Sequence, residues 1–483
     1  MPRQISLLLC LLVFGLTSVT AAQPPQLPGF GPEKPPVNPV HERQKSEAEQ
    51  AYKVRRFDKA IELTNSVIRE NREDHVAYYL RASAKIEKAI QSRDVKLIRE
   101  GINDARMSIN FAAQDAVSMY YLPYLYGMTN LASLEQRPQH AEVAVSIAQQ
   151  AIAMTPKPAD RANLLYQLGL AYSQLGKHQE SAQAFEQAIG LVNEHLGAHI
   201  GAADALAKAG QTSEAKAAYD RTVERFPSKP LVYNNRGMFL QKNGQYDQAV
   251  VDFTRALEIN PKFYTAHTNR GYAFMKQQQF AAAENDFSES LRINPNQVVL
   301  FSLRGTSRLL QSKFDDATSD YNQVVNADPR NAVALADLGF ARFFAGDFAG
   351  AQTAFGRAIE IDQKHNYLNP WISLSLIKSG QAEAARERFA TELRRSVDQW
   401  NWVDQLLQFA NGNLSSNQLL AAVSTDSAVR DAQMCEAYFF IGERLSREGN
   451  MEAARQQYEA AVKTGASHLS AFRGSLLALG SNP

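Results

Sequence analysis

A 34-residue internal repeat constrains the fold of this chain more than any other sequence feature. Six segments of this length cover residues 162–365 without an insertion. Each contains a small residue, then Ala or Ser twelve positions later and an aromatic residue sixteen positions later. Because one such segment is too small to bury its own apolar side chains, successive segments must pack on one another. The small residues are Gly169, Ala203, Gly237, Gly271, Gly305 and Gly339, and the aromatic residues are Phe185, Tyr219, Phe253, Phe287, Tyr321 and Phe355.

Each segment also carries the pattern of two helices. Apolar residues recur at helical spacing in two runs, which a polar or glycine-containing turn such as Asn243–Gly244 separates. Proline near the end of four segments stops the second helix before the next segment begins. The small residues let the two helices approach closely, and the aromatic residues fill the space between neighbouring segments. The sequence therefore predicts an all-α fold of antiparallel helix hairpins.

This combination of spacing, small residues and terminal proline resembles the tetratricopeptide repeat. The resemblance implies a right-handed α-solenoid, in which the hairpins stack in chain order. It also implies that protein or peptide partners bind on the inner face formed by the first helix of each hairpin.

The rest of the chain is organised around this regular block. Residues 435–462 restore the repeat pattern with Gly442, Ala454 and Tyr458, whereas 41–161 and 366–434 follow it loosely. The predicted divisions are 1–22 as a signal peptide, 23–40 as a proline-rich tether, 41–161 as irregular N-terminal hairpins, 162–365 as six regular units, 366–434 as degenerate hairpins, 435–468 as a C-terminal repeat, and 469–483 as a capping helix and tail.

The first residues have the features of a secretory signal peptide. Arg3 precedes an apolar run over residues 5–16, and small residues follow at Ala21 and Ala22. The run is short for a membrane span, and retention as an uncleaved anchor is the alternative. Cleavage leaves Cys435 as the single cysteine, so no intramolecular disulfide forms. We expect an exported chain with no membrane span after cleavage, in a bacterial periplasm or cell envelope, or secreted.

A proline-rich segment lies between the predicted signal peptide and the repeats. Seven of the nineteen residues in 22–40 are proline, which disfavours regular secondary structure. We interpret this segment as an extended tether, and a short proline-rich ligand for another protein is the alternative.

Arginine and aspartate recur at equivalent positions of three regular units. The units that lack the arginine also lack the aspartate, as at Leu168 and Ala184 or at Leu338 and Ala354. This co-occurrence predicts an ion pair between the two helices of a unit, which fixes their register. A ladder of anion-binding arginines is the alternative. The pairs are Arg236/Asp252, Arg270/Asp286 and Arg304/Asp320, each sixteen residues apart, and Arg81/Asp104 repeats them with a seven-residue insertion.

The resemblance places candidate ligand-binding residues on the inner face of the first helices. Asn235 and Asn269 occupy equivalent positions, at which an asparagine ladder in related proteins holds the backbone of an extended peptide. An amide donates and accepts hydrogen bonds at once, which suits contact with peptide groups. In the units that start at residues 230 and 264 the predicted inner-face residues are Asn234, Asn235, Gln241, Lys242, Asn269, Tyr272 and Lys276.

The same face becomes apolar further along the chain, where Phe340, Phe343 and Phe344 replace these polar side chains. An exposed apolar patch of this kind marks an interaction site. The alternative is that the irregular C-terminal hairpins curl back and cover the three rings. Both interpretations are compatible with the sequence.

Several classes of function are disfavoured. The 51 basic and 50 acidic residues are spread along the chain without a basic patch, so nucleic acid is not expected as a partner. The sequence contains neither a phosphate-binding glycine loop nor a nucleophile elbow. His195 and His199 are four residues apart but lack a third ligand, so a metal site is disfavoured. We expect no enzyme, no cofactor and no metal.

Two functions from different classes remain. The first is an exported scaffold or adaptor that binds peptide segments or partner proteins in its concave groove. The C-terminal third is similar to bacterial envelope lipoprotein adaptors at Trp371, at Trp400 and Trp402, and at residues 435–445, but the sequence lacks a lipid-attachment motif. The second is a structural spacer or self-associating repeat protein with no dedicated ligand.

Overall fold

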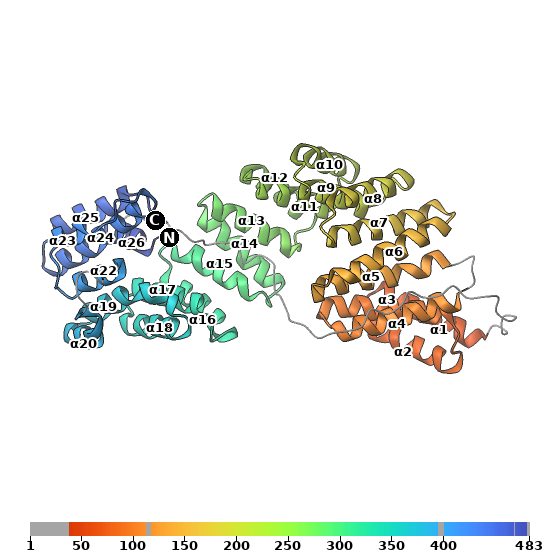
Figure 1. Ribbon diagram of the computed structural model, residues 1–483, viewed down its shortest axis with the longest axis horizontal. Coiled ribbons are helices and arrows are strands. Elements are labelled where there is room, and N and C mark those ends of the chain that lie inside the picture. The colour runs from red at the N-terminus through yellow and green to blue at the C-terminus, as the bar shows by residue number, and fades with distance from the viewer. Residues whose placement is uncertain (1–37, 113–116, 395–399, 468, 481–483) are drawn as a thin grey trace. The chain divides into compact units, whose positions relative to one another are not determined.

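The computed structural model describes residues 38–112, 117–394, 400–467 and 469–480 (Figure 1). All regular secondary structure in these ranges is helical, which confirms the predicted fold class. The predicted signal peptide and most of the tether lie outside the described residues. The end of the tether does not, because α1 (Pro39–Lys53) begins inside it. Proline is tolerated in the first helical turn, where an N–H has no partner, and the Asn38 side chain accepts a hydrogen bond from the Val40 N–H.

The chain divides into two compact units between Phe239 and Leu240, within α11 (Pro230–Lys242). We call the part before the division the N-terminal unit. Before α11 it contains α1, α2 (Phe57–Glu70), α3 (His75–Ser92), α4 (Val95–Phe111), α5 (Val117–Glu135), α6 (Pro138–Met154), α7 (Pro158–Gln174), α8 (His178–Leu191), α9 (Leu196–Lys208) and α10 (Thr212–Arg225).

The part from Leu240 onward is the C-terminal unit. None of the helices in the described ranges of either unit is long and apolar enough to cross a membrane. After α11, the C-terminal unit contains α12 (Tyr246–Ile259), α13 (Tyr264–Lys276), α14 (Phe280–Ile293), α15 (Val298–Leu309), α16 (Phe314–Ala327), α17 (Ala332–Phe344), α18 (Phe348–Ile361), the 3-10 helix η2 (Gln363–Leu368), α19 (Asn369–Lys378), α20 (Ala382–Arg388), α21 (Ala390–Leu393), α22 (Trp402–Ala410), α23 (Ser416–Ala421), α24 (Ser427–Arg447), α25 (Met451–Lys463) and α26 (Ser470–Ala478).

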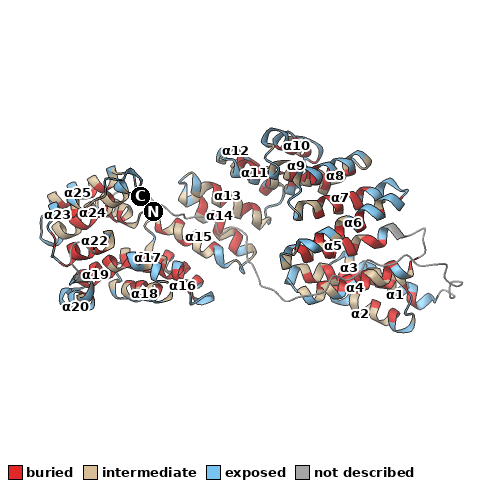
Figure 2. Cartoon of the chain, viewed as in Figure 1, coloured by how far each residue is buried: buried red, intermediate tan, exposed pale blue. Residues whose placement is uncertain are grey.

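The small and aromatic repeat positions meet inside each hairpin. Phe287 and Phe355 are fully buried, as are the inward sides of the helices around them (Figure 2). A Cβ atom on Gly271 would lie 2.9 Å from the Phe287 ring, and one on Gly339 would lie 2.4 Å from the Phe355 ring. The ring therefore occupies the space that a larger residue on the partner helix would need, and this contact sets how closely the two helices approach.

The turn between the two helices of a hairpin needs a left-handed backbone residue. Glycine meets this need at most repeats, since it reaches positive φ without a Cβ clash. Gln278 and Ser312 occupy the same repeat position with φ of 60° and 61°. These two turns therefore carry strain that the glycine turns lack. The glycines are Gly176, Gly210, Gly244, Gly346 and Gly380, with φ between 70° and 84°.

The regular register extends one hairpin beyond the predicted boundary at residue 365. Gly380, Ala385 and Phe389 lie 34 residues after Gly346, Ala351 and Phe355, and Ala385 and Phe389 are buried in the same way. Helix α19 forms the first half of this hairpin and α20 with α21 the second. The 3-10 helix η2 immediately precedes α19 and interrupts the regular helical spacing of the repeat. For this reason the sequence pattern predicts a degenerate segment where this hairpin lies. The helix that contains Cys435 begins eight residues before the predicted start of the C-terminal repeat at residue 435. Asp426 caps this helix, α24, which begins at Ser427.

Candidate functional site

Two arginines of the C-terminal unit form two-pronged ion pairs between the helices of one hairpin. Arg270 on α13 donates from Nε and Nη2 to the two carboxylate oxygens of Asp286 on α14, both at 2.8 Å. Arg304 on α15 contacts Asp320 on α16 in the same way, at 3.0 and 2.7 Å. Both carboxylates are buried and each has one further partner, His267 for Asp286 and Arg308 for Asp320, at 2.8 and 2.9 Å. Removal of the arginine would therefore leave a buried carboxylate with only part of its compensation.

The third guanidinium nitrogen of each arginine donates to the preceding hairpin. Nη1 of Arg270 donates to Thr254 Oγ1 at 3.0 Å, and Nη1 of Arg304 donates to Ser288 Oγ at 3.2 Å. Each guanidinium thus connects two successive hairpins and is engaged by acceptors of the protein itself. This arrangement favours a structural role over the alternative of an anion-binding ladder.

The N-terminal unit holds the other two arginines of the series. Arg81 on α3 donates to both carboxylate oxygens of Asp104 on α4, at 2.8 and 2.6 Å. Arg236 on α11 donates from Nη1 to Asp220 on α10 at 2.9 Å. Its predicted partner, Asp252, belongs to the C-terminal unit.

Apart from the three phenylalanines, five predicted groove residues belong to the C-terminal unit, and three of these five share one side of α13. Asn269 and Tyr272 are half-buried and Lys276 is exposed, at the spacing of three and four residues that aligns side chains on a helix. The Lys276 ammonium lies 5.3 Å from the centre of the Tyr272 ring. At the end of α11, Gln241 is half-buried and Lys242 is exposed. Helix α13 therefore presents amide, phenol and ammonium groups together.

The two predicted asparagines of the N-terminal unit differ in exposure. Asn234 is only 4% exposed, and it donates from Nδ2 to the Asn235 side-chain oxygen at 3.3 Å. Asn235 is half-buried. Asn235 is therefore the more accessible of the two, and Asn234 is mainly part of the packing of α11.

The aromatic residues assigned to the groove require a correction. Phe340 and Phe343 on α17 are buried, at 8% and 5% exposure, and Phe344 is half-buried. The Trp371 ring on α19 covers them, with ring-centre distances of 5.1, 5.2 and 6.3 Å. Trp371 in turn stacks on Phe439 of α24 at 5.2 Å. The structure therefore favours internal packing over a ligand groove at α17, because the C-terminal helices of the same unit cover these rings.

The two histidines considered as metal ligands have other roles. His195 accepts a hydrogen bond from the Ala198 N–H and caps α9, while its ring packs on Tyr166. His199 donates from Nε2 to the Asn193 carbonyl at 2.9 Å. Within the described part of the chain, no group of three or more potential ligands lies close enough to hold a metal ion.

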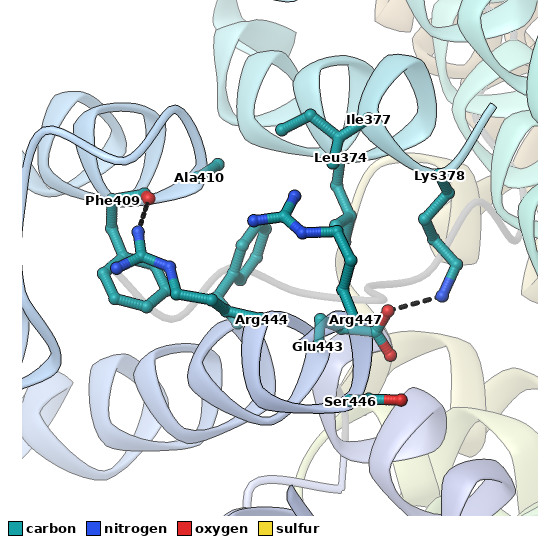
Figure 3. A pocket seen from close by; sticks show the side chains of 10 residues that line it. Leu374, Ile377, Lys378, Phe409, Ala410, Glu443, Arg444, Ser446 and Arg447 are labelled. Atoms are coloured by element: carbon teal, nitrogen blue, oxygen red, sulfur yellow. Dashed lines mark hydrogen bonds and ion pairs between the residues drawn. The ribbon is translucent and has the colours of Figure 1, made fainter. Parts of the chain in front are cut away.

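A pocket that the sequence did not predict lies between α19, α22 and α24 of the C-terminal unit (Figure 3). Its volume is about 260 Å³. The lining combines apolar side chains with four charged ones, of which three are cationic and one is anionic. It comprises Leu374, Ile377, Lys378, Phe409, Ala410, Phe440, Glu443, Arg444, Ser446 and Arg447.

The stacked hairpins define the class of protein, a helical-repeat scaffold for protein–protein interactions. Models of the tetratricopeptide repeat match residues 129–198, 172–234, 230–263 and 264–297. Residues 129–297 thus consist of tetratricopeptide repeats. Members of this family are generally not enzymes. No curated protein matches the chain.

Several solved structures are similar to parts of the chain. PilF of Pseudomonas aeruginosa has 20% identity over 42% of this chain and 92% of its own, with a TM-score of 0.37. YrrB, a tetratricopeptide-repeat protein with an unusual peptide-binding site, has 23% identity over 38% and 95%, with a TM-score of 0.36. A tetratricopeptide repeat protein from Parabacteroides merdae has 16% identity over 56% and 99%, with a TM-score of 0.39.

Proposed function

We propose that the chain is an exported scaffold that binds extended peptide segments along α13 and α15 of its C-terminal unit. The observation that carries this proposal is the shared side of α13 with Asn269, Tyr272 and Lys276. The amide pairs with peptide groups, the phenol offers a rigid contact surface, and the ammonium attracts acidic side chains. An extended peptide is the ligand that uses all three at once.

The neighbouring helix supplies an apolar complement. Helix α15 contacts α13, and its Val298 and Val299 are 41% and 60% exposed. Leu303, one turn after Val299, is half-buried. A peptide held by its backbone on α13 would place an apolar side chain on α15. The proposed surface ends there, because Trp371 covers Phe340 and Phe343 on α17, the next first helix.

A matched pair of variants tests this surface. N269A/Y272A/K276A removes the three groups on α13, and E289A/R292A removes an exposed ion pair on α14. Peptides are first selected from a random library on the full-length chain, and their dissociation constants are then measured by fluorescence anisotropy. We expect at least tenfold weaker binding for the α13 variant and unchanged binding for the α14 variant. Equal affinities for the two variants would remove α13 as the site.

The structural spacer is the second candidate function. It predicts that selection enriches no peptide and that sedimentation velocity shows concentration-dependent assembly of the chain. Selected peptides that bind a monomeric chain would exclude it.

We also propose that the chain is exported to a bacterial periplasm or cell envelope. The support is the apolar run over residues 5–16 and the small residues that follow it. Cell fractionation followed by N-terminal sequencing tests this. The expected mature chain starts at Ala22 or Gln23 and is found outside the cytoplasm. An intact N-terminus on cytoplasmic protein contradicts export.

A further inference from the structure

The pocket between α19, α22 and α24 has a charge imbalance that its own residues do not correct. Its single carboxylate, Glu443, is engaged twice within the fold. It accepts a hydrogen bond from the Lys378 ammonium at 2.5 Å and another from the Tyr458 hydroxyl at 3.0 Å. Two arginines of α24, Arg444 and Arg447, therefore share the pocket without a carboxylate from its lining.

Arg444 is fixed as a cation in a poorly solvated place. Its guanidinium carbon lies 3.5 Å from the centre of the Phe409 ring. It donates hydrogen bonds to the Leu414 carbonyl at 2.9 Å and to the Phe409 carbonyl. Burial lowers the pKa of Arg444 and neighbouring Arg447 lowers it further, while Glu448 opposes this shift. Its hydrogen-bond acceptors are thus neutral carbonyls, and the nearby carboxylate of Glu448, which does not line the pocket, offsets only part of its charge.

Arg447 is placed to receive a ligand. It is one helical turn from Arg444, and its side chain reaches from α24 into the space between α19 and α22 (Figure 3). It is exposed, and among the described residues it has no ion pair. A guanidinium presents two parallel N–H groups that match the two oxygens of a carboxylate.

The pocket also has an apolar part, formed by side chains of α19, α22 and α24. Leu374 and Ile377 of α19 lie across from Ala410 of α22 (Figure 3), and Phe440 of α24 also lines the pocket. A volume of about 260 Å³ is at the small end for ligand sites, and it suits one short apolar group rather than a large cofactor. The apolar wall also disfavours a fully hydrated anion such as inorganic phosphate.

We propose that this pocket binds a carboxylate joined to a short apolar group, with Arg447 holding the carboxylate and α19 with α22 enclosing the apolar part. Two sources have this chemistry, the apolar C-terminal residue of a peptide and a free medium-chain carboxylic acid. The site is separate from the proposed peptide surface on α13, so loss of one does not imply loss of the other.

Isothermal titration calorimetry on the full-length chain tests the chemistry with four probes. N-acetyl-leucine and octanoate carry both features, N-acetyl-leucinamide lacks the carboxylate, and N-acetylglycine lacks the apolar group. We expect binding of the first two and at least tenfold weaker binding of the last two. Amide binding equal to acid binding, or no binding of any probe, overturns the proposal. A tighter Kd for a leucine-terminated tetrapeptide than for octanoate assigns the peptide source, and the reverse assigns the free acid.

Variants on the same helix locate the site. Arg447→Gln removes the guanidinium, while Arg430→Gln removes an exposed arginine of α24 that pairs with Asp431 outside the pocket. We expect at least a tenfold loss of affinity for N-acetyl-leucine in Arg447→Gln and none in Arg430→Gln. Because Arg447 is exposed, both variants should keep the wild-type melting temperature. Full affinity in Arg447→Gln would place the ligand elsewhere and overturn the assignment.

Discussion

The C-terminal unit uses two chemistries at equivalent repeat positions. In α13–α16, Arg270 and Arg304 reach buried aspartates on the second helix of each hairpin. In α17 and α18 the equivalent position holds Leu338, buried at 3% exposure, and the inner face holds aromatic rings under Trp371. The ion-paired part, α13–α16, fixes register through directional bonds and leaves its inner face accessible, with polar groups on α13 and apolar ones on α15. The aromatic part gains burial and uses its inner face for its own packing.

The largest effect on stability is expected at Trp371, because the packing of the aromatic part depends on its ring. Trp371 is 3% exposed and touches Phe340, Phe343 and Phe439. Trp371→Ala should lower the free energy of unfolding by about 3–5 kcal/mol, because the ring leaves a cavity. Urea unfolding measures the loss, and hydrogen exchange should show faster opening of α17, α19 and α24 than of α13. Equal acceleration in α13 would mean that the two parts unfold as one.

Substitutions in one hairpin of the ion-paired part can give it the residues found at the equivalent positions of the aromatic part. Arg270→Leu leaves Asp286 buried with His267 as its remaining partner, at 2.8 Å, and should cost about 3 kcal/mol in unfolding free energy. The triple variant H267L/R270L/D286A reproduces the Leu335, Leu338 and Ala354 set of α17 and α18. It should cost less than the single variant, since no charge is left buried. A larger loss in the triple variant would show that the ion pair stabilises beyond its own burial cost.

Asp337 is a carboxylate on α17, within the aromatic part. Burial raises the pKa of Asp337 on α17 to about 6, and nearby Arg473 of α26 reduces this rise. The folded pKa exceeds the unfolded one, so the stability that protonated Asp337 contributes is present at low pH and is lost as pH rises through about 6. Asp337→Asn should remove this loss between pH 4 and 7 in thermal unfolding. An unchanged pH profile would mean that Asp337 is charged throughout.

The sequence predicts one part of this unit better than the other, for a physical reason. Arg270 and Asp286 recur at fixed spacing, and a contact inside one hairpin repeats whenever its residues repeat. The packing of Trp371 on Phe439 joins segments 68 residues apart and occurs once, so no periodicity reveals it. The same limit applies to the pocket, since α19, α22 and α24 meet only in the folded chain.

The hydrogen bonds from the arginines to the preceding hairpin are only partly predictable from the sequence. Thr254 and Ser288 lie sixteen residues before Arg270 and Arg304, so their signal is present in the repeat. It is weak, because Thr and Ser are common on exposed helix faces for other reasons. Only the structure shows that these hydroxyls face a guanidinium, and that each arginine connects two hairpins rather than one.

The smallest predicted effect concerns the turns of the ion-paired part. Gln278 and Ser312 hold φ near 60°, whereas Gly346 and Gly380 fill the equivalent turns of the aromatic part. A non-glycine residue there costs about 1–2 kcal/mol, and glycine recovers part of this because it also loses more chain entropy on folding. Gln278→Gly and Ser312→Gly should therefore each raise the free energy of unfolding by about 0.5–1 kcal/mol, measured by urea titration. Gly346→Ala is the matched reverse change and should lower it. If all three substitutions lower stability, the side chains at residues 278 and 312 contribute more than their backbone strain costs, and the ion-paired part would then depend on its turns as well as on its arginines.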